Sequence, residues 1–155
     1  MRIMGVDPGV TGGWALIEGR ALTKVFDLEV NSIGSTNQID PLAFRTVLQE
    51  YRPNVVVIED NRANGANGSK ANYSMGLSMG IILGVSLGAG VAIGRVKPIE
   101  WQRTHGLGGI PAVSRKDAHR ARASELWPEM AARFKLKKDH NRADAALIAE
   151  HWRRT

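Results

Sequence analysis

Val55-Val56-Val57-Ile58, followed at once by Glu59-Asp60, is the stretch that decides the fold. Its β-branched residues form a run that is too short for a helix and apolar on both faces. A central parallel strand of an α/β sheet has this pattern because both of its faces are covered. We therefore predict a strand over residues 55–58 that ends in two carboxylates.

The chain before this strand predicts an antiparallel meander over residues 1–30. Residues 2–7 form an apolar run that ends in Asp7-Pro8-Gly9, and a second apolar run, 14–17, follows two glycines. Glycine and proline favour turns, whereas Ile and Val favour β-strands, so each apolar run is expected to be a strand. A third strand is expected over about 22–30.

A helix is predicted between the meander and the strand over 55–58. Residues 31–38 are polar and are interpreted as a loop. Asp40 then resembles a helix N-cap and Pro41 a first helical residue, and the apolar spacing continues to Tyr51. After the strand, the segment 61–70 is rich in Asn and Gly and predicts a surface loop.

Residues 71–94 carry no formal charge, and this stretch is long enough to span a bilayer. Six glycines argue against a membrane span, since each disfavours an isolated helix by about 1 kcal/mol relative to Ala. We expect a buried helix followed by a strand over about 90–96. Gly76, Gly80, Gly84 and Gly88 form one stripe that permits close backbone approach, either to a second copy of the chain or to its own sheet.

Three further helices are expected in the basic C-terminal part. A short one surrounds Trp101 and Arg103. A basic amphipathic helix should open with Ser114 as its cap, place Asp117 at the third helical position and stop at Trp127-Pro128. The last should run from about 139 to 152. With no linker or repeat in between, residues 1–155 are interpreted as a single α/β domain.

Composition narrows the classes of function. The 155 residues contain no Cys, which excludes a disulfide scaffold, a thiolate zinc site and a cysteine nucleophile. A carboxylate as early as Asp7 argues against a secretory signal peptide, so a cytoplasmic location is expected. The formal net charge is +6, and residues 95–155 hold 14 Lys and Arg against 7 Asp and Glu. Such a region attracts a polyanion, either nucleic acid or an anionic membrane surface.

Asp7, Glu59 and Asp144 lie where a purely structural role is hard to assign. Asp7 and Glu59 end neighbouring strands, where sites of open α/β sheets commonly lie. Carboxylates this close repel each other unless a hard cation such as Mg²⁺ neutralises them. His140 lies four residues before Asp144, on the same side of a helix, and would make Mn²⁺ a credible substitute. Asp139 is the reserve ligand if the helix begins later.

Each of these residues also has an ordinary structural alternative. Asp7 could cap the turn at Pro8-Gly9, Glu59 could be a loop acid, and His140 could be a solvated residue at a helix start. Asp144 could pair with a Lys or Arg on the helix face. The metal-site hypothesis therefore depends on their joint placement.

Three motifs in order along the chain resemble the RuvC-type Holliday-junction resolvases, most closely the phage-type branch. They are Asp7-Pro8-Gly9 with Thr11-Gly12, Val57-Ile58-Glu59, and His140-Asn141-Arg142-Ala143-Asp144-Ala145. The resemblance implies a ribonuclease-H-like fold, that is, a mixed five-stranded sheet flanked by helices. It also implies a homodimer that binds branched DNA and, with two Mg²⁺ ions per active site, nicks two opposed strands of a four-way junction.

Carried over by position, Asp7, Glu59 and Asp144 match three metal-binding acids of that family. The fourth position is Asp or His in such enzymes, and His140 is the nearest match, although another alignment places Asn141 there. Lys116 resembles a family lysine near the scissile phosphate. The loop after Glu59 lacks the aromatic wedge of some members. Basic residues expected to contact DNA phosphates are Arg62, Lys70, Arg103, Arg115, Arg120 and Arg122.

Two other classes of function stay open at this point. The segment from Asp7 to Gly13 also resembles the first phosphate loop of actin-like and sugar-kinase phosphotransferases, although the chain has no length for their second domain. A non-catalytic DNA-binding module could instead use only the basic region. Its binding would be sensitive to salt and indifferent to Asp7 or Glu59.

Overall fold

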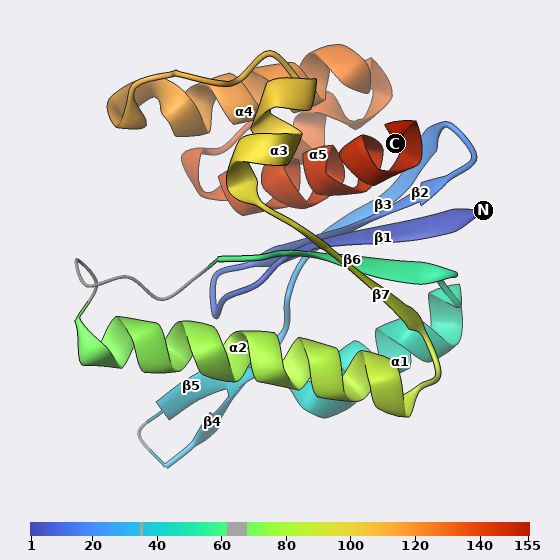
Figure 1. The fold of residues 1–155 in the computed structure, drawn as a ribbon, viewed down its shortest axis with the longest axis vertical. Coiled ribbons are helices and arrows are strands. Elements are labelled where there is room, and N and C mark those ends of the chain that lie inside the picture. Colours follow the sequence, from blue (N-terminus) through green and yellow to red (C-terminus); the bar gives the residue numbers. More distant parts are fainter. Residues whose placement is uncertain (35, 62–67) are drawn as a thin grey trace.

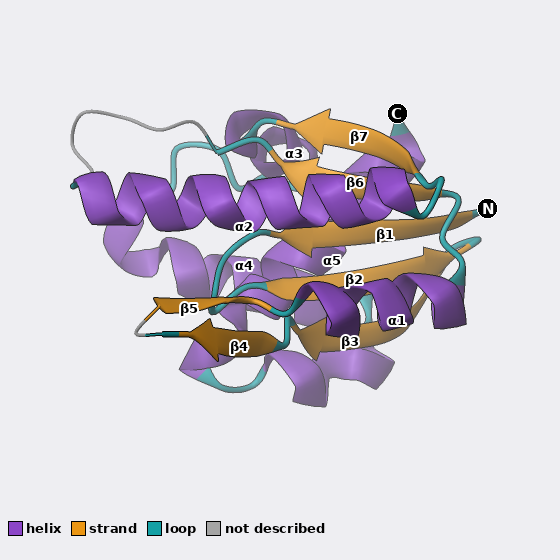
Figure 2. Cartoon of the chain, turned by 90° about the horizontal axis from the view of Figure 1, so that it is seen from below, coloured by secondary structure: helices purple, strands orange, loops and turns teal. Residues whose placement is uncertain are grey.

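A computed structural model describes residues 1–34, 36–61 and 68–155 of the chain. Its main sheet has the strand order β3-β2-β1-β6-β7. Strands β2 and β3 run antiparallel to their neighbours, whereas β6 and β7 run parallel to β1 (Figure 2). The strands are β1 (Arg2–Asp7), β2 (Gly13–Glu18), β3 (Ala21–Asp27), β6 (Val55–Glu59) and β7 (Ala92–Val96). The predicted meander, the central parallel strand and the mixed five-stranded α/β sheet are therefore confirmed.

Helices cover both faces of the sheet (Figure 1). Helices α1 (Pro41–Tyr51) and α2 (Ser69–Gly88) lie on one face. The other face carries α3 (Pro98–Thr104), α4 (Ala112–Leu126) and α5 (His140–Arg154). Two 3-10 helices, η1 (Pro128–Phe134) and η2 (Lys137–Asp139), connect α4 to α5.

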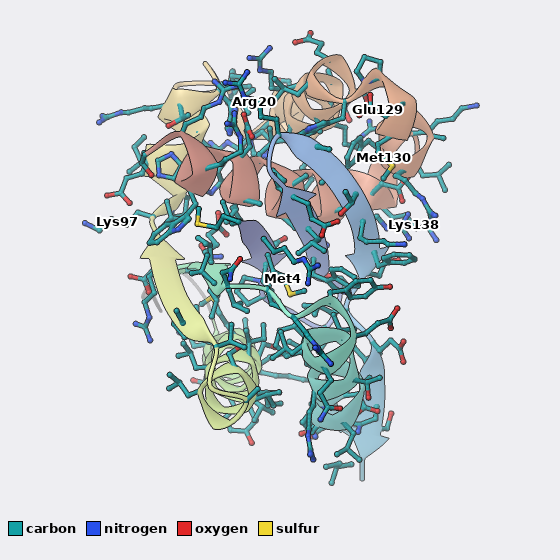
Figure 3. The ribbon with its side chains drawn as sticks, turned by 90° about the vertical axis from the view of Figure 1, so that its right-hand side faces the viewer. Met4, Arg20, Lys97, Glu129, Met130 and Lys138 are labelled. Atoms are coloured by element: carbon teal, nitrogen blue, oxygen red, sulfur yellow. The ribbon has the colours of Figure 1, made fainter. Side chains whose placement is uncertain are left out.

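Two apolar cores result, one on each side of the sheet. Met4 belongs to the core shared with α1 and α2, which includes Phe44 and Ile82. Met130 packs against the opposite core, which contains Trp101 and much of α5. Figure 3 labels both methionines, with Met4 between the sheet and α1 and Met130 beyond it near η1. The two cores fix the sheet as the middle layer of three.

Helix α5 lies directly on β1 and β2 because small residues face one another. A Cβ atom added to Gly5 would collide with the carbonyl oxygen of Ala145 and lie 2.7 Å from the backbone nitrogen of Ala149. A Cβ on Gly13 would lie 3.1 Å from the backbone of Arg142. This close approach brings the start of α5 to the ends of the first two strands.

Several predicted boundaries need correction. The third strand ends at Asp27, and Leu28 donates its backbone N–H to the Gly12 carbonyl instead of continuing it. The supposed loop after it contains a hairpin, β4 (Val30–Ile33) and β5 (Thr36–Ile39). In α4, the cap is Pro111 rather than Ser114, whose hydroxyl bonds to the Pro111 carbonyl, so Asp117 lies beyond the first turn.

The N-cap assignment of Asp40 is confirmed. Its side chain accepts hydrogen bonds from the backbone N–H groups of Leu42 and Ala43, at 2.9 and 3.1 Å. Two donors that the first turn leaves without helical partners are thereby satisfied.

Helix α2 begins two residues before the expected segment and is buried on one side only, through Ser78, Ile82 and Ser86. Its glycine stripe does not pack on the sheet. A Cβ added at Gly76, Gly80, Gly84 or Gly88 would meet nothing within 4 Å in the described part of the chain. The internal-packing alternative is therefore wrong for these residues. Among the described helices, none has the length and apolar character needed to cross a membrane.

Candidate active site

Asp7 and Glu59 lie side by side at one end of the sheet. The parallel register pairs Val6 with Ile58, so the next residue in each strand is a carboxylate. Beyond Asp7 the chain turns sharply, with the Gly12 N–H donating to the Gly9 carbonyl at 2.9 Å. A side chain on Gly12 would run into the Asp7 carbonyl, so glycine is required for this turn.

Asp144 reaches the same place from α5. It directly precedes Ala145, the residue that packs against Gly5 in β1. The helix therefore delivers this carboxylate close to the end of β1. Three acids from three separate elements, the first strand, the central parallel strand and the last helix, thus meet at one edge of the sheet.

Burial and mutual repulsion make these carboxylates hard to ionise. Burial, then the nearby charges of Asp144 and Glu59, raise the pKa of Asp7 well above its usual range. The pKa of Asp144 is also raised well above that range, first by burial and then by Glu59. Lys116 on α4 acts in the opposite direction on both groups. Without a cation, such a cluster tends to hold protons.

The carboxylate of Glu59 accepts two side-chain hydrogen bonds. It is 8% exposed, and burial raises its pKa. Its Oε1 accepts a 2.8 Å hydrogen bond from the Trp101 indole N–H, and its Oε2 accepts one from the Asn61 amide. Both bonds favour the ionised form and partly offset the effect of burial.

His119 holds Asp144 in a comparable way. Its Nδ1 lies 2.6 Å from Asp144 Oδ1. When the Asp144 carboxylate is ionised it can only accept, so Nδ1–H is then the donor. Burial first, then the charge of Arg115, lowers the pKa of His119 to about 4, so the ring is neutral at pH 7. Sequence reasoning missed His119 and the role of Trp101; the signal available was the position of His119 one helical turn after Lys116.

The donor set suits a hard divalent cation, because carboxylate oxygens are the ligands that Mg²⁺ and Mn²⁺ accept most readily. The raised pKa values have the same implication, since a cation would relieve the repulsion. Even so, no group of three His, Asp or Glu side chains within residues 1–34, 36–61 and 68–155 is arranged to hold an ion.

The residues considered as a fourth metal ligand make contacts with other parts of the protein. His140 Nδ1 is 3.0 Å from the Lys137 carbonyl. Asp139 is buried, accepts the Leu136 N–H at 2.8 Å and pairs with Arg142. Asn141 donates its amide to the Thr11 carbonyl, beside the turn after β1. A ligand role for His140 or Asp139 stays a prediction.

The basic residues considered for DNA contact differ in their exposure and in their ion pairs. Lys70, Arg103, Arg115 and Lys116 are exposed. Arg120 instead ties α4 to η1, donating to the Phe134 carbonyl and pairing with Asp117 at 2.6 Å. Arg122 pairs with Glu125 at 3.0 Å. Arg62 lies outside the described residues.

No protein-family model matches the chain, and no curated protein does. Among solved structures, Thermus thermophilus RuvC in complex with a Holliday junction substrate is 19% identical, with a TM-score of 0.61, over 97% of this chain and 92% of that one. The yeast mitochondrial Holliday junction resolvase is 15% identical, with a TM-score of 0.59, over 99% and 79%.

A viral structure shares the same architecture. Fowlpox virus resolvase with its substrate Holliday junction DNA is 17% identical, with a TM-score of 0.52, over 99% of this chain and 97% of that one. At these identities the likeness is one of fold. The chain has the RuvC-like, ribonuclease-H-like fold that its motifs predicted.

Proposed function

We propose that this chain is a metal-dependent, structure-selective endonuclease that resolves four-way DNA junctions by paired symmetric nicks. The observation that carries the proposal is the meeting of Asp7, Glu59 and Asp144 at one edge of a RuvC-like sheet. In enzyme terms it would be a crossover junction endodeoxyribonuclease, acting on phosphodiester bonds in DNA.

The substrate class rests on charge and on the fold. Two of the similar structures are complexes with Holliday junction DNA. Residues 95–155 carry twice as many Lys and Arg as Asp and Glu, and α4 lies in this part. Exposed Lys70, Arg103 and Arg115 are the candidates for phosphate contacts, which position the DNA without reading its sequence.

Asp7, Glu59 and Asp144 would hold two divalent ions, Mg²⁺ with Mn²⁺ able to substitute. When bound, such ions activate a water molecule and stabilise the leaving 3′-oxygen of a phosphodiester. Around them, Trp101 and Asn61 hydrogen-bond to Glu59, and the His119 ring contacts Asp144. The Lys116 ammonium, which already acts on Asp7 and Asp144, would stabilise negative charge on the phosphate.

A homodimer is part of the proposal, because two symmetric nicks need two active sites. The stripe from Gly76 to Gly88 supports this, since its glycines face open space among the described residues. Two such stripes could pack closely across a two-fold axis. The exposed Tyr73 and Leu87 on the same helix would add apolar area to that contact.

Asp7→Asn is the decisive test. The variant keeps the size of the side chain and removes the charge that the ions require, so nicking should fall about a thousandfold or more, which corresponds to roughly 4 kcal/mol in the barrier. Junction binding should survive or strengthen, because repulsion of phosphate by the acid is lost. The measurement incubates a labelled four-way junction and a matched linear duplex with and without Mg²⁺ or Mn²⁺.

Asp60→Asn is the matched control, because Asp60 lies at the same strand end but pairs with Arg95 at 3.8 Å. It should nick at close to the wild-type rate. Undiminished Mg²⁺-dependent nicking by Asp7→Asn would refute the catalytic assignment. Junction binding without any nicking would favour the basic binding module, and ATP binding in calorimetry without junction binding would favour the phosphotransferase.

A further inference from the structure

Trp101 and His119 come from different helices, and each places a ring nitrogen within hydrogen-bond distance of a different acid of the cluster. Trp101 on α3 donates from Nε1 to Glu59 Oε1 at 2.8 Å. His119 on α4 has its Nδ1 2.6 Å from Asp144 Oδ1, and it donates an N–H there when that carboxylate is ionised. The sequence motifs that predicted the acids include neither ring.

The two rings also contact each other. Their centroids are 4.9 Å apart and their planes are inclined at 70°, which is the favourable edge-to-face arrangement. Both are buried, Trp101 at 1% exposed and His119 at 3%. Neither ring can turn without disturbing the other, so the two donor groups form one rigid unit behind the carboxylates.

Ring N–H groups are chemically suited to orient the carboxylates of a metal site without binding the metal themselves. A lysine or arginine at either place would neutralise the carboxylate and compete with a cation for it. A neutral N–H group orients the carboxylate and favours its ionised form while leaving its full negative charge for the ion.

We infer that Trp101 and His119 are a positioning pair that orients Glu59 and Asp144 toward a divalent cation. The inference rests on the proposed function for the identity of the cluster as a metal site. Neither ring is assigned a contact with DNA, with water or with the ion. Their effect is transmitted only through the two carboxylates.

The test measures Mn²⁺ affinity directly, by counting free Mn²⁺ with electron paramagnetic resonance. Trp101→Phe keeps an aromatic ring but removes the N–H, and His119→Ala removes the second donor. Each should raise the Kd for Mn²⁺ at least about tenfold, the usual effect of losing a partner that orients a ligand. His119→Asn should recover much of the affinity, because its amide nitrogen can occupy the place of Nδ1.

Two matched variants control for lost packing. Trp127 is buried to a similar degree, 4% exposed, in the same core, and has no bond to the acids among the described residues. His105 is also buried with a pKa near 4, but its Nε2 donates to the Leu147 carbonyl. Trp127→Phe and His105→Gln should bind Mn²⁺ as the wild type does. Circular dichroism and urea unfolding verify folding, and if Trp101→Phe unfolds, the two His119 variants decide.

The inference is overturned if Trp101→Phe and His119→Ala bind Mn²⁺ with wild-type affinity, or if the controls lose as much. It is also overturned if His119→Asn is no better than His119→Ala. Junction nicking by the same proteins separates this result from the proposed function. If the wild type binds Mn²⁺ but never nicks the junction, the proposed nuclease function is wrong and the positioning pair stands. If the wild type nicks the junction and the Trp101 and His119 variants keep its Kd for Mn²⁺, the nuclease function stands and the positioning pair is wrong. A wild type that binds no Mn²⁺ overturns both.

Discussion

The glycines under α5 and the glycines along α2 serve opposite purposes. Gly5 and Gly13 lie in the sheet, where an added Cβ would collide with the backbone of α5 at Gly5 and press tightly against it, at 3.1 Å, at Gly13. Gly80 and Gly84 lie on a helix, where an added Cβ would meet nothing within 4 Å in the described chain. The first pair lacks side chains where there is little or no space for them. The other pair lacks side chains where space is available.

This difference separates residues that build the candidate site from residues that face outward. Without Gly5, α5 could not lie close enough to β1 for Asp144 to reach Asp7. Glycine inside α2 instead weakens the helix by about 1 kcal/mol per residue relative to Ala, with no compensation inside the described chain. The compensation we propose comes from a second copy of the protein.

Gly5→Ala should have the largest effect. The new methyl group overlaps the Ala145 carbonyl, so α5 must shift, and the free energy of unfolding should fall by about 3 kcal/mol. Urea unfolding followed by circular dichroism measures the change. Mn²⁺ affinity should fall as well, because Asp144 moves with the helix. A variant as stable as the wild type would show that α5 does not lie on β1 as described.

The two faces of the sheet also differ in their buried ionisable groups. The described buried polar residues on α2 are serines, whereas His105 lies between α3 and α5. Burial lowers the pKa of His105 from 6.5 to about 4. Because the folded protein binds this proton less readily than the unfolded chain, the stabilisation is complete above pH 6.5 and is lost as the pH falls toward 4, by about 3 kcal/mol.

His105→Gln isolates this contribution, because the glutamine amide can still donate to the Leu147 carbonyl but cannot titrate. The difference in unfolding free energy between wild type and variant should change by about 3 kcal/mol between pH 7 and pH 4. Urea titrations at several pH values measure it. Other titrating groups are common to both proteins and cancel. A difference that is constant with pH would contradict burial of a neutral ring.

Gly84→Ala should have the smallest effect and the opposite sign from Gly5→Ala. The methyl group enters open space, so the substitution should stabilise the monomer by about 1 kcal/mol through helix propensity alone. The measurement is urea unfolding at a concentration where the protein is monomeric. A loss of stability there would mean that this face of α2 is covered within the chain.

Sedimentation of Gly84→Leu completes this comparison. If the stripe is a dimer face, the larger side chain should prevent two helices from approaching and leave a monomer. A wild type that is already monomeric at working concentration removes the dimer assignment. An unchanged dimer in Gly84→Leu places the contact elsewhere on the protein.

The fold was predictable from the sequence where the local residue pattern matches the position of the segment in the folded protein. The β-branched run at 55–58 and the proline at position 41 gave correct elements because burial and capping act locally. The hairpin β4–β5 was missed because its short strands are mostly exposed and polar. Its turn signal was Gly34, which has a φ of 63° that favours glycine.

The site was predictable only in part. Asp7 and Glu59 could be paired from sequence because parallel strands end at one edge, and Asp144 came from a motif. Trp101 and His119 could not be found this way, since an indole and an imidazole in two helices carry no pattern that indicates their carboxylate partners. Only the path of the chain between β7 and α5 brings them there.

The packing of α5 on β1 has a consequence for synthesis on the ribosome. Strand β1 is made first and α5 last, so a nascent chain carries an uncovered Gly5 surface and lacks Asp144 until translation of α5 is complete. Long-range contacts of this kind also form late and slowly in folding. A half-made protein therefore has no complete acid cluster, and the proposed nuclease activity would arise only in molecules that have finished folding.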